Sequence, residues 1–169
     1  DNSVDASTVS VYECIAINSL PVSKRGTLYQ GAILDAQTMH EMAEYVNNGG
    51  SVPLHNLHDQ DIALPVGRVF CCEVRTTFSG TTELRTLFYL PNSEVDLIAK
   101  LEANVVDEVS VGFLPKKIQC SKCGFDFLGS EATFENIWTL TCNNDHTIGE
   151  DGVHSKLSGL GQWMELSLV

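Results

Sequence analysis

Apolar and polar residues alternate over several short stretches of the chain, which indicates a protein built mainly from β-strands. Residues 8–18 are rich in β-branched and apolar side chains. Further strands are predicted at 27–34, 65–76, 83–90, 105–114 and 162–169. The polar stretch 77–82 predicts a hairpin turn between two of them. Residues 52–58 predict only a short extended segment, at a sheet edge or a loop entry, because Pro53 has no N–H for a central ladder.

Two segments have helical rather than alternating spacing. The first is expected to begin after Asp35, a good N-cap residue, and to end at the Asn-Asn-Gly-Gly sequence of 47–50. Its apolar positions are Met39, Met42, Ala43 and Val46. The second is expected to begin near Ser93, whose spacing to Asp96 resembles a capping box. Its apolar positions are Leu97, Ile98 and Leu101.

These elements predict a mainly β or α+β fold, in which an antiparallel or mixed β-barrel carries two flanking helices. The strands follow one another as hairpins and do not alternate regularly with helices, which argues against a doubly wound sheet. A chain of 169 residues fits one domain, here 1–169. Residues 118–158 contain the late cysteines and are interpreted as an insert within that domain, shaped like a zinc-ribbon hairpin.

The net charge of the chain limits the classes of molecule that we expect it to bind. Twenty-two acidic residues against ten basic ones give a net charge of −12. Such a surface repels phosphate backbones and anionic lipid, so we expect no nucleic-acid and no membrane partner. A protein or peptide partner agrees better with this charge. No apolar run approaches the roughly 18 residues of a spanning helix, and residues 1–5 do not have the character of a signal peptide.

The six cysteines are too unevenly spaced for a disulfide scaffold, and a reducing compartment with a local metal site fits them better. Cys14, Cys71 and Cys72 are interpreted as buried or strand-borne thiols. The other three lie together at 120–142.

A metal site is predicted from the late cysteines. Cys120 and Cys123 are separated by two residues, so both thiolates can face one cation. Cys142 and His146 are the best candidates to complete a tetrahedron, with His154 as the alternative fourth ligand. Sulfur and imidazole in a closed four-ligand set are typical of Zn²⁺ in a structural role.

A second group of residues suggests nucleophilic catalysis. Alternation along 109–113 places Ser110 on the opposite side from the valines next to it. The same argument places Glu165 on the opposite side from its apolar neighbours in the last strand, so both side chains should emerge on one side of the sheet. His55 and His58 lie in a segment expected to be loop-like, and an imidazole there could act as the base for Ser110.

Three stretches resemble the tailed-bacteriophage prohead, or capsid maturation, proteases. His58-Asp59 precedes a Pro-Val-Gly sequence at 65–67, which is similar to the family's His-Asp ahead of a Pro-Ile-Gly strand. The Val-Ser-Val-Gly-Phe sequence of 109–113 resembles its nucleophile strand, and the Glu-Leu-Ser-Leu-Val sequence of 165–169 resembles its Glu-Ile-Ser-Leu-Val strand. The three occur in the family's order. The family is similar in fold to the herpesvirus assemblin proteases.

The resemblance implies a serine endopeptidase with Ser110 as nucleophile, His58 as base and Glu165 as third member, with Asp59 as a rival for that place. Its peptide substrates would be the scaffold or the scaffold-like arm of the major capsid protein, cut inside the phage procapsid in the host cytoplasm. A homo-oligomer is a further possible partner. The cysteine-bearing insert is not part of the basic family pattern. The alternative is a catalytically silent virion protein that keeps the protease fold and uses the insert to dock.

Overall fold

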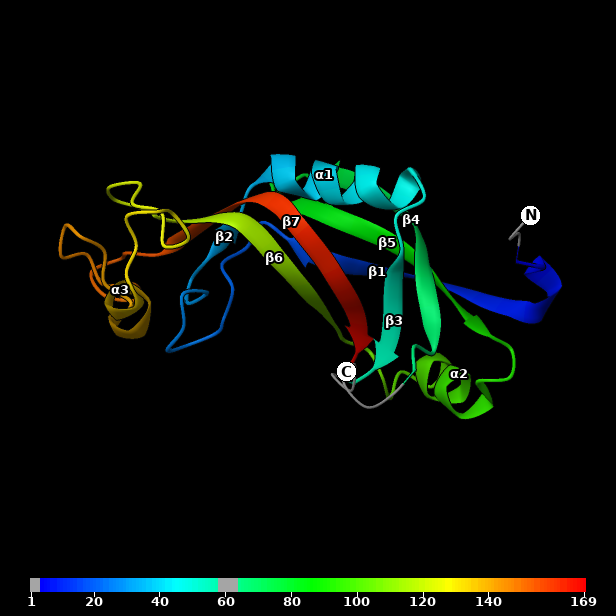
Figure 1. Cartoon of the computed structure of the whole chain (residues 1–169). Coiled ribbons are helices and arrows are strands. Elements are labelled where there is room, and N and C mark those ends of the chain that lie inside the picture. The colour runs from blue at the N-terminus through cyan, green and yellow to red at the C-terminus, as the bar shows by residue number, and fades with distance from the viewer. Residues whose placement is uncertain (1–3, 58–63) are drawn as a thin grey trace.

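The computed structural model describes residues 4–57 and 64–169, and its main feature is one mixed β-sheet that curls into a half-barrel (Figure 1). The strands are β1 (Val9–Asn18), β2 (Ile33–Leu34), β3 (Val52–Asn56), β4 (Gly67–Thr76), β5 (Thr82–Pro91), β6 (Val109–Cys120) and β7 (Ser155–Leu168). A short 3-10 helix, η1 (Ala6–Thr8), precedes them, and the α-helices are α1 (Ala36–Asn47), α2 (Val95–Glu102) and α3 (Phe134–Thr139).

The sheet follows the order β1-β5-β4-β3-β7-β2, and β6 also pairs with β7. The β2–β7 and β3–β7 pairs are parallel and the other pairs are antiparallel. The predicted mainly β architecture with a mixed sheet is therefore confirmed. None of the helices in the described ranges is both long and apolar enough to cross a membrane.

Helix α1 lies across the sheet, where it contacts β4, β5 and β7 (Figure 1). Its N-cap is Asp35, as predicted, and the Asp35 carboxylate accepts a 2.6 Å hydrogen bond from the Thr38 backbone N–H. All four predicted apolar positions of this helix are buried in the main core. The helix therefore covers the sheet with the face that the sequence pattern indicated.

The strand predicted at 27–34 is wrong over most of its length, because only Ile33 and Leu34 form β2. The preceding residues fold back locally. Gly31 has a φ of +66° and donates a 2.9 Å hydrogen bond to the Val22 carbonyl. This left-handed backbone turns the chain and so interrupts an extended strand.

The segment predicted as an edge or loop, 52–58, instead forms the central strand β3 over Val52–Asn56. Pro53 is tolerated there because the parallel ladder to β7 begins one residue later, where Leu54 pairs with Leu166. The missing N–H of Pro53 therefore interrupts none of the β3–β7 pairing.

The predicted capping box at the second helix is also wrong. Helix α2 has Glu94 at its N-cap and no side-chain hydrogen bond at that position. A turn in which the Glu94 N–H bonds to the Pro91 carbonyl at 2.9 Å precedes the helix, so the helix begins one residue later than Ser93 would allow.

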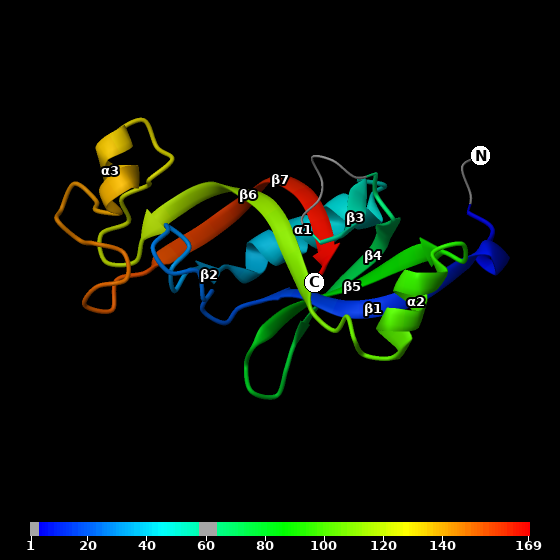
Figure 2. The ribbon, with the colours of Figure 1, turned by 90° about the horizontal axis from the view of Figure 1, so that it is seen from below.

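The insert is the tip of a long ribbon made by β6 and β7. The two strands pair from Val109–Leu168 to Cys120–Ser155, well past the ends predicted for them. The remaining residues, 121–154, form the tip and contain α3, which the sequence pattern did not predict. The described residues thus form three α-helices where two were expected. Both views show this tip at the far end of the ribbon (Figures 1 and 2).

Candidate functional site

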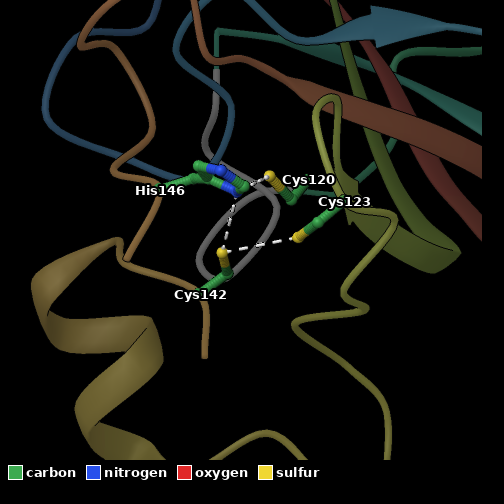
Figure 3. A group of neighbouring side chains, drawn as sticks. All are labelled: Cys120, Cys123, Cys142 and His146. Atoms are coloured by element: carbon green, nitrogen blue, oxygen red, sulfur yellow. Dashed lines mark hydrogen bonds between the residues drawn. The ribbon is translucent and has the colours of Figure 1, made fainter. Parts of the chain in front are cut away.

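The predicted metal ligands come together at the base of the insert. One ligand atom from each of Cys120, Cys123, Cys142 and His146 lies within 4.8 Å of the others (Figure 3). Cys123 Sγ lies 3.5 Å from Cys142 Sγ. His146 Nδ1 lies 3.5 Å from Cys142 Sγ and 3.7 Å from Cys120 Sγ. These four side chains are close enough to hold one metal ion.

Two tight turns position the four ligands. Cys120 ends β6, and the Gly124 N–H donates a 2.9 Å hydrogen bond back to its carbonyl. Gly124 has a φ of +75°, which lets the chain turn directly after Cys123. In the second turn, the Cys142 N–H bonds to the His146 carbonyl at 3.0 Å. Backbone geometry therefore aims both pairs of ligands at the same point.

The surroundings of Cys123 favour its thiolate form, whereas those of Cys142 do not. Partial desolvation opposes ionisation of Cys123, but hydrogen bonds from the Phe125 backbone and from the Asn144 and His146 side chains lower its pKa to about 6. For Cys142, burial is the largest effect and the pKa is raised. A cation would stabilise both thiolates, because metal ligation requires the deprotonated form.

His154, the alternative fourth ligand, does not belong to this group. Its Nδ1 lies 3.3 Å from the Gly152 carbonyl oxygen, which holds the ring near its own backbone. The donor set formed by the described residues is therefore the one predicted with His146.

The second predicted group lies toward the other end of the β6–β7 ribbon. Ser110 of β6 pairs with Ser167 of β7, and Ser167 pairs in turn with His55 of β3. Residues in register on neighbouring strands project to the same face. Ser110, Ser167 and His55 therefore form one row of polar side chains across three strands.

Glu165 lies on the same face, one row further along β7. It is only 2% exposed, and its Oε2 accepts a 2.7 Å hydrogen bond from the Ser167 hydroxyl. Gly112, its partner on β6, leaves room for it, because a Cβ there would lie 2.7 Å from Glu165 Cγ. Ser110 and Glu165 are thus diagonal cross-strand neighbours, a relation that spans roughly 7–8 Å. An imidazole fits between two groups at that separation.

The structure describes only one of the two candidate histidines, His55. His55 is 5% exposed, and its Nδ1 has no hydrogen-bond partner among the described residues. Ser167 lies between it and Ser110 in the row. His58, the predicted base, and Asp59, the rival acid, lie outside the described residues. The predicted loop-like setting is wrong for His55, which belongs to β3.

A cavity of about 380 Å³ lies between β6 and the end of β1. Val109, Val111 and Phe113 line it together with Ser110, so it lies on the face of β6 opposite the side chains of Ser110 and Glu165. The opposite wall comes from the end of β1 and the loop after it, including Leu20 and Tyr29. The cavity is large enough for peptide side chains, and most of its lining is apolar.

Ser167 is a residue of this site to which sequence reasoning gave no role. Its hydroxyl is fully buried and bonds to the buried carboxylate of Glu165. The available signal was its position two residues after Glu165 on the same strand, which places both side chains on one face.

Comparison of the chain with known protein families, with curated proteins and with solved structures finds no match.

Proposed function

We propose that the chain is a serine endopeptidase with Ser110 as its nucleophile. The observation that carries the proposal is the position of Ser110 and Glu165 as diagonal neighbours on one face of β6 and β7. Glu165 is buried, and the Ser167 hydroxyl donates a hydrogen bond that fixes its carboxylate. A carboxylate fixed in this way beside a serine is suited to hold and orient a catalytic imidazole.

In this mechanism His58 is the base. It takes the proton of the Ser110 hydroxyl as the oxygen attacks the substrate carbonyl, and it then gives that proton to the leaving amine. A water molecule then attacks the acyl-enzyme. His58 takes a proton from this water and returns a proton to the Ser110 oxygen, which releases the acid product. Glu165 holds the imidazole in the correct tautomer and stabilises it when charged, and Ser167 fixes the carboxylate.

The resemblance to the prohead proteases of tailed bacteriophages supports the same assignment and extends it. It adds the substrates, which are the scaffold and the scaffold-like arm of the major capsid protein, and the place of action inside a procapsid. It also adds a fold similar to the assemblin proteases. These extensions rest on the short motifs around Ser110, His58 and Glu165.

We further propose that the metal is Zn²⁺ and that its role is structural. Tetrahedral zinc with ordinary bond lengths puts sulfur atoms about 3.8 Å apart and sulfur and nitrogen about 3.6 Å apart. The corresponding distances here are 3.5 Å between the Cys123 and Cys142 sulfurs and 3.5–3.7 Å from His146 Nδ1 to sulfur. Four protein ligands leave no coordination position for a substrate.

The endopeptidase is tested with an unfolded, carboxymethylated protein as substrate. The wild-type chain should cut it, and Ser110→Ala should lower the rate by at least about a thousandfold. Ser158→Ala is the matched control, because Ser158 is equally part-buried in the same ribbon and pairs with Lys117 away from the site. Cleavage that survives in Ser110→Ala would refute the assignment.

A further inference from the structure

Strand β6 has a free edge next to the candidate nucleophile. Among the described residues, 109–117 pair only with β7, so the backbone groups on the other side of this stretch have no ladder partner. Only the end of the strand is covered on that side, where the Phe127 N–H donates a 2.8 Å hydrogen bond to the Ile118 carbonyl. Strand β1, which lies across from this edge, pairs only with β5. The half-barrel is therefore open between β6 and β1.

The free part of this edge lacks the features that normally prevent pairing with another chain. Natural edge strands are protected by charged side chains, prolines, bulges or a covering segment. Residues 109–114 contain no charge and no proline. At the register shift between Gly112 and Phe113, the extra residue belongs to β7, so β6 itself has no bulge there. A stretch of this kind can accept a further strand through its backbone.

The cavity of about 380 Å³ reaches this edge. It is lined by three consecutive residues of β6, 109–111, and by three consecutive residues at the end of β1, 16–18. Successive residues of a strand point to opposite faces, so a cavity that touches all three borders the edge of the strand as well as its core face. Lys24 is the only charged side chain in the lining. The space therefore suits one large apolar side chain of a strand that lies along β6.

A strand added at this edge places its backbone and its side chains on suitable sides of the sheet. Ladder hydrogen bonds lie within the sheet, so the amide planes of the added strand lie close to the sheet surface. The Ser110 side chain projects from the face opposite the cavity, so its hydroxyl approaches a carbonyl of that strand from above the amide plane, as nucleophilic attack requires. Every second side chain of the same strand points toward the cavity. Cleavage and selection therefore use opposite faces of one strand.

We propose that the polypeptide substrate binds as an additional strand on the free edge of β6, over 109–114, with one large apolar side chain in the cavity on the core face. The proposal rests on the endopeptidase function proposed above and names its substrate class. That class is an extended, unfolded segment, recognised by its backbone hydrogen bonds and by one apolar residue. Regular elements of a folded domain are not substrates, because their backbone groups are already paired.

The test uses fluorescein-labelled peptides of seven residues, made of glycine, serine and threonine with a leucine at the centre. Binding to the Ser110→Ala chain is followed by fluorescence anisotropy, so no cleavage interferes. Replacing the leucine by alanine should weaken binding at least about tenfold, because the cavity then loses most of an apolar side chain. Absence of binding by the leucine peptide, even at about 1 mM, would overturn the proposal.

Pairing with β6 predicts an alternating effect of N-methylation, which removes one backbone donor at a time. Alternate N–H groups of an extended strand point to the same edge. Methyl groups at every second position should therefore weaken binding at least about tenfold, and those between should have little effect. In the same complex, hydrogen exchange of the amides in 109–114 should slow. Effects without alternation, or unchanged exchange in 109–114, would contradict the added strand.

The role of the cavity is tested by Leu20→Ala in the same background. Leu20 lines the cavity and is 54% exposed, so its truncation should reduce the preference for leucine over alanine at least about threefold. Leu128→Ala is the matched control, because Leu128 is 50% exposed and lies in the insert, outside the cavity lining. The control should keep the preference. An unchanged preference in Leu20→Ala would remove the cavity from substrate selection.

These outcomes separate the binding mode from catalysis. Alternation in a chain whose cleavage activity does not depend on Ser110 would keep the strand-binding edge and remove the protease. Cleavage that depends on Ser110, with no alternation, would keep the protease and remove the added strand.

Discussion

At the scale of single residues, the most informative contact is the hydrogen bond from Ser167 to Glu165. Both side chains are buried, and the carboxylate oxygen lies 2.7 Å from the hydroxyl. A donor that reaches a buried charge contributes more than an ordinary hydrogen bond, because the charge has lost much of its solvation by water. The contact therefore links the stability of β7 to the orientation of the proposed third catalytic residue.

Ser167→Ala should accordingly lower the free energy of unfolding by about 1–3 kcal/mol. Urea denaturation at neutral pH measures this loss. Ser155→Ala is the matched control, because Ser155 is also fully buried in β7 but its hydroxyl has no hydrogen-bond partner among the described residues. Its removal should cost nothing or stabilise slightly. Equal losses in the two variants would contradict the role given to Ser167.

The cysteines should differ sharply in reactivity. Burial raises the pKa of Cys14 to about 12 and that of Cys72 to about 11, whereas hydrogen bonds lower the pKa of Cys123 to about 6. Only the thiolate reacts with iodoacetamide, so at about pH 8 the exposed Cys123 should be alkylated well before Cys14 and Cys72 once a chelator is present. Cys14 and Cys72 should react only in denaturant. Mass spectrometry of the modified peptides checks the order, and early alkylation of Cys14 would contradict the assigned burial.

At the scale of elements, the ribbon formed by β6 and β7 carries both candidate sites. The candidate metal ligands lie at and next to its tip, and Ser110 and Glu165 lie toward its other end. The tip has few buried side chains, so metal binding should supply much of its folding free energy. The paired strands belong to the main sheet, which has a core of its own.

The zinc content of two variants should show which histidine of the insert is a metal ligand. His146→Ala should reduce bound zinc in the purified protein to below about half an equivalent, whereas His154→Ala should keep close to one equivalent. Elemental analysis of both variants measures this directly. Loss of zinc in His154→Ala with retention in His146→Ala would exchange their roles.

The elements that could be predicted from the sequence are those governed by local pattern. The spacing of Met39 and Met42 indicated the buried face of α1. The β-branched and apolar composition of 8–18 indicated β1, and the polar turn at 77–82 indicated the hairpin of β4 and β5. Strand β3 was misjudged because its place depends on a parallel pairing with β7, more than a hundred residues away. Helix α3 was missed because six residues give too short a period to recognise.

At the scale of the whole molecule, the two candidate sites were predictable to different degrees. Metal-ligand spacing is local chemistry, so Cys120 and Cys123 were found from four consecutive residues. The common face of Ser110 and Glu165 followed from alternation, but their diagonal register depends on how β6 and β7 align. No local pattern could place His55 in the same row, because three separate strands must meet there.

Metal removal should consequently act on one end of the molecule. In the presence of a chelator, limited proteolysis should cut within 121–154, while the sheet around Ser110 stays resistant. Fragment masses map the cuts. First cuts in β1 or β5 would mean that the stability of the main sheet depends on the metal, which would contradict this prediction.

Covalent labelling by a fluorophosphonate, followed by peptide mapping, shows most directly whether Ser110 is a nucleophile. We expect the reagent to attach to Ser110, the label to be absent from Ser110→Ala, and Glu165→Gln to slow the reaction. A folded, zinc-loaded protein that remains unlabelled at Ser110, both dilute and at high concentration, would contradict a catalytic serine at this position.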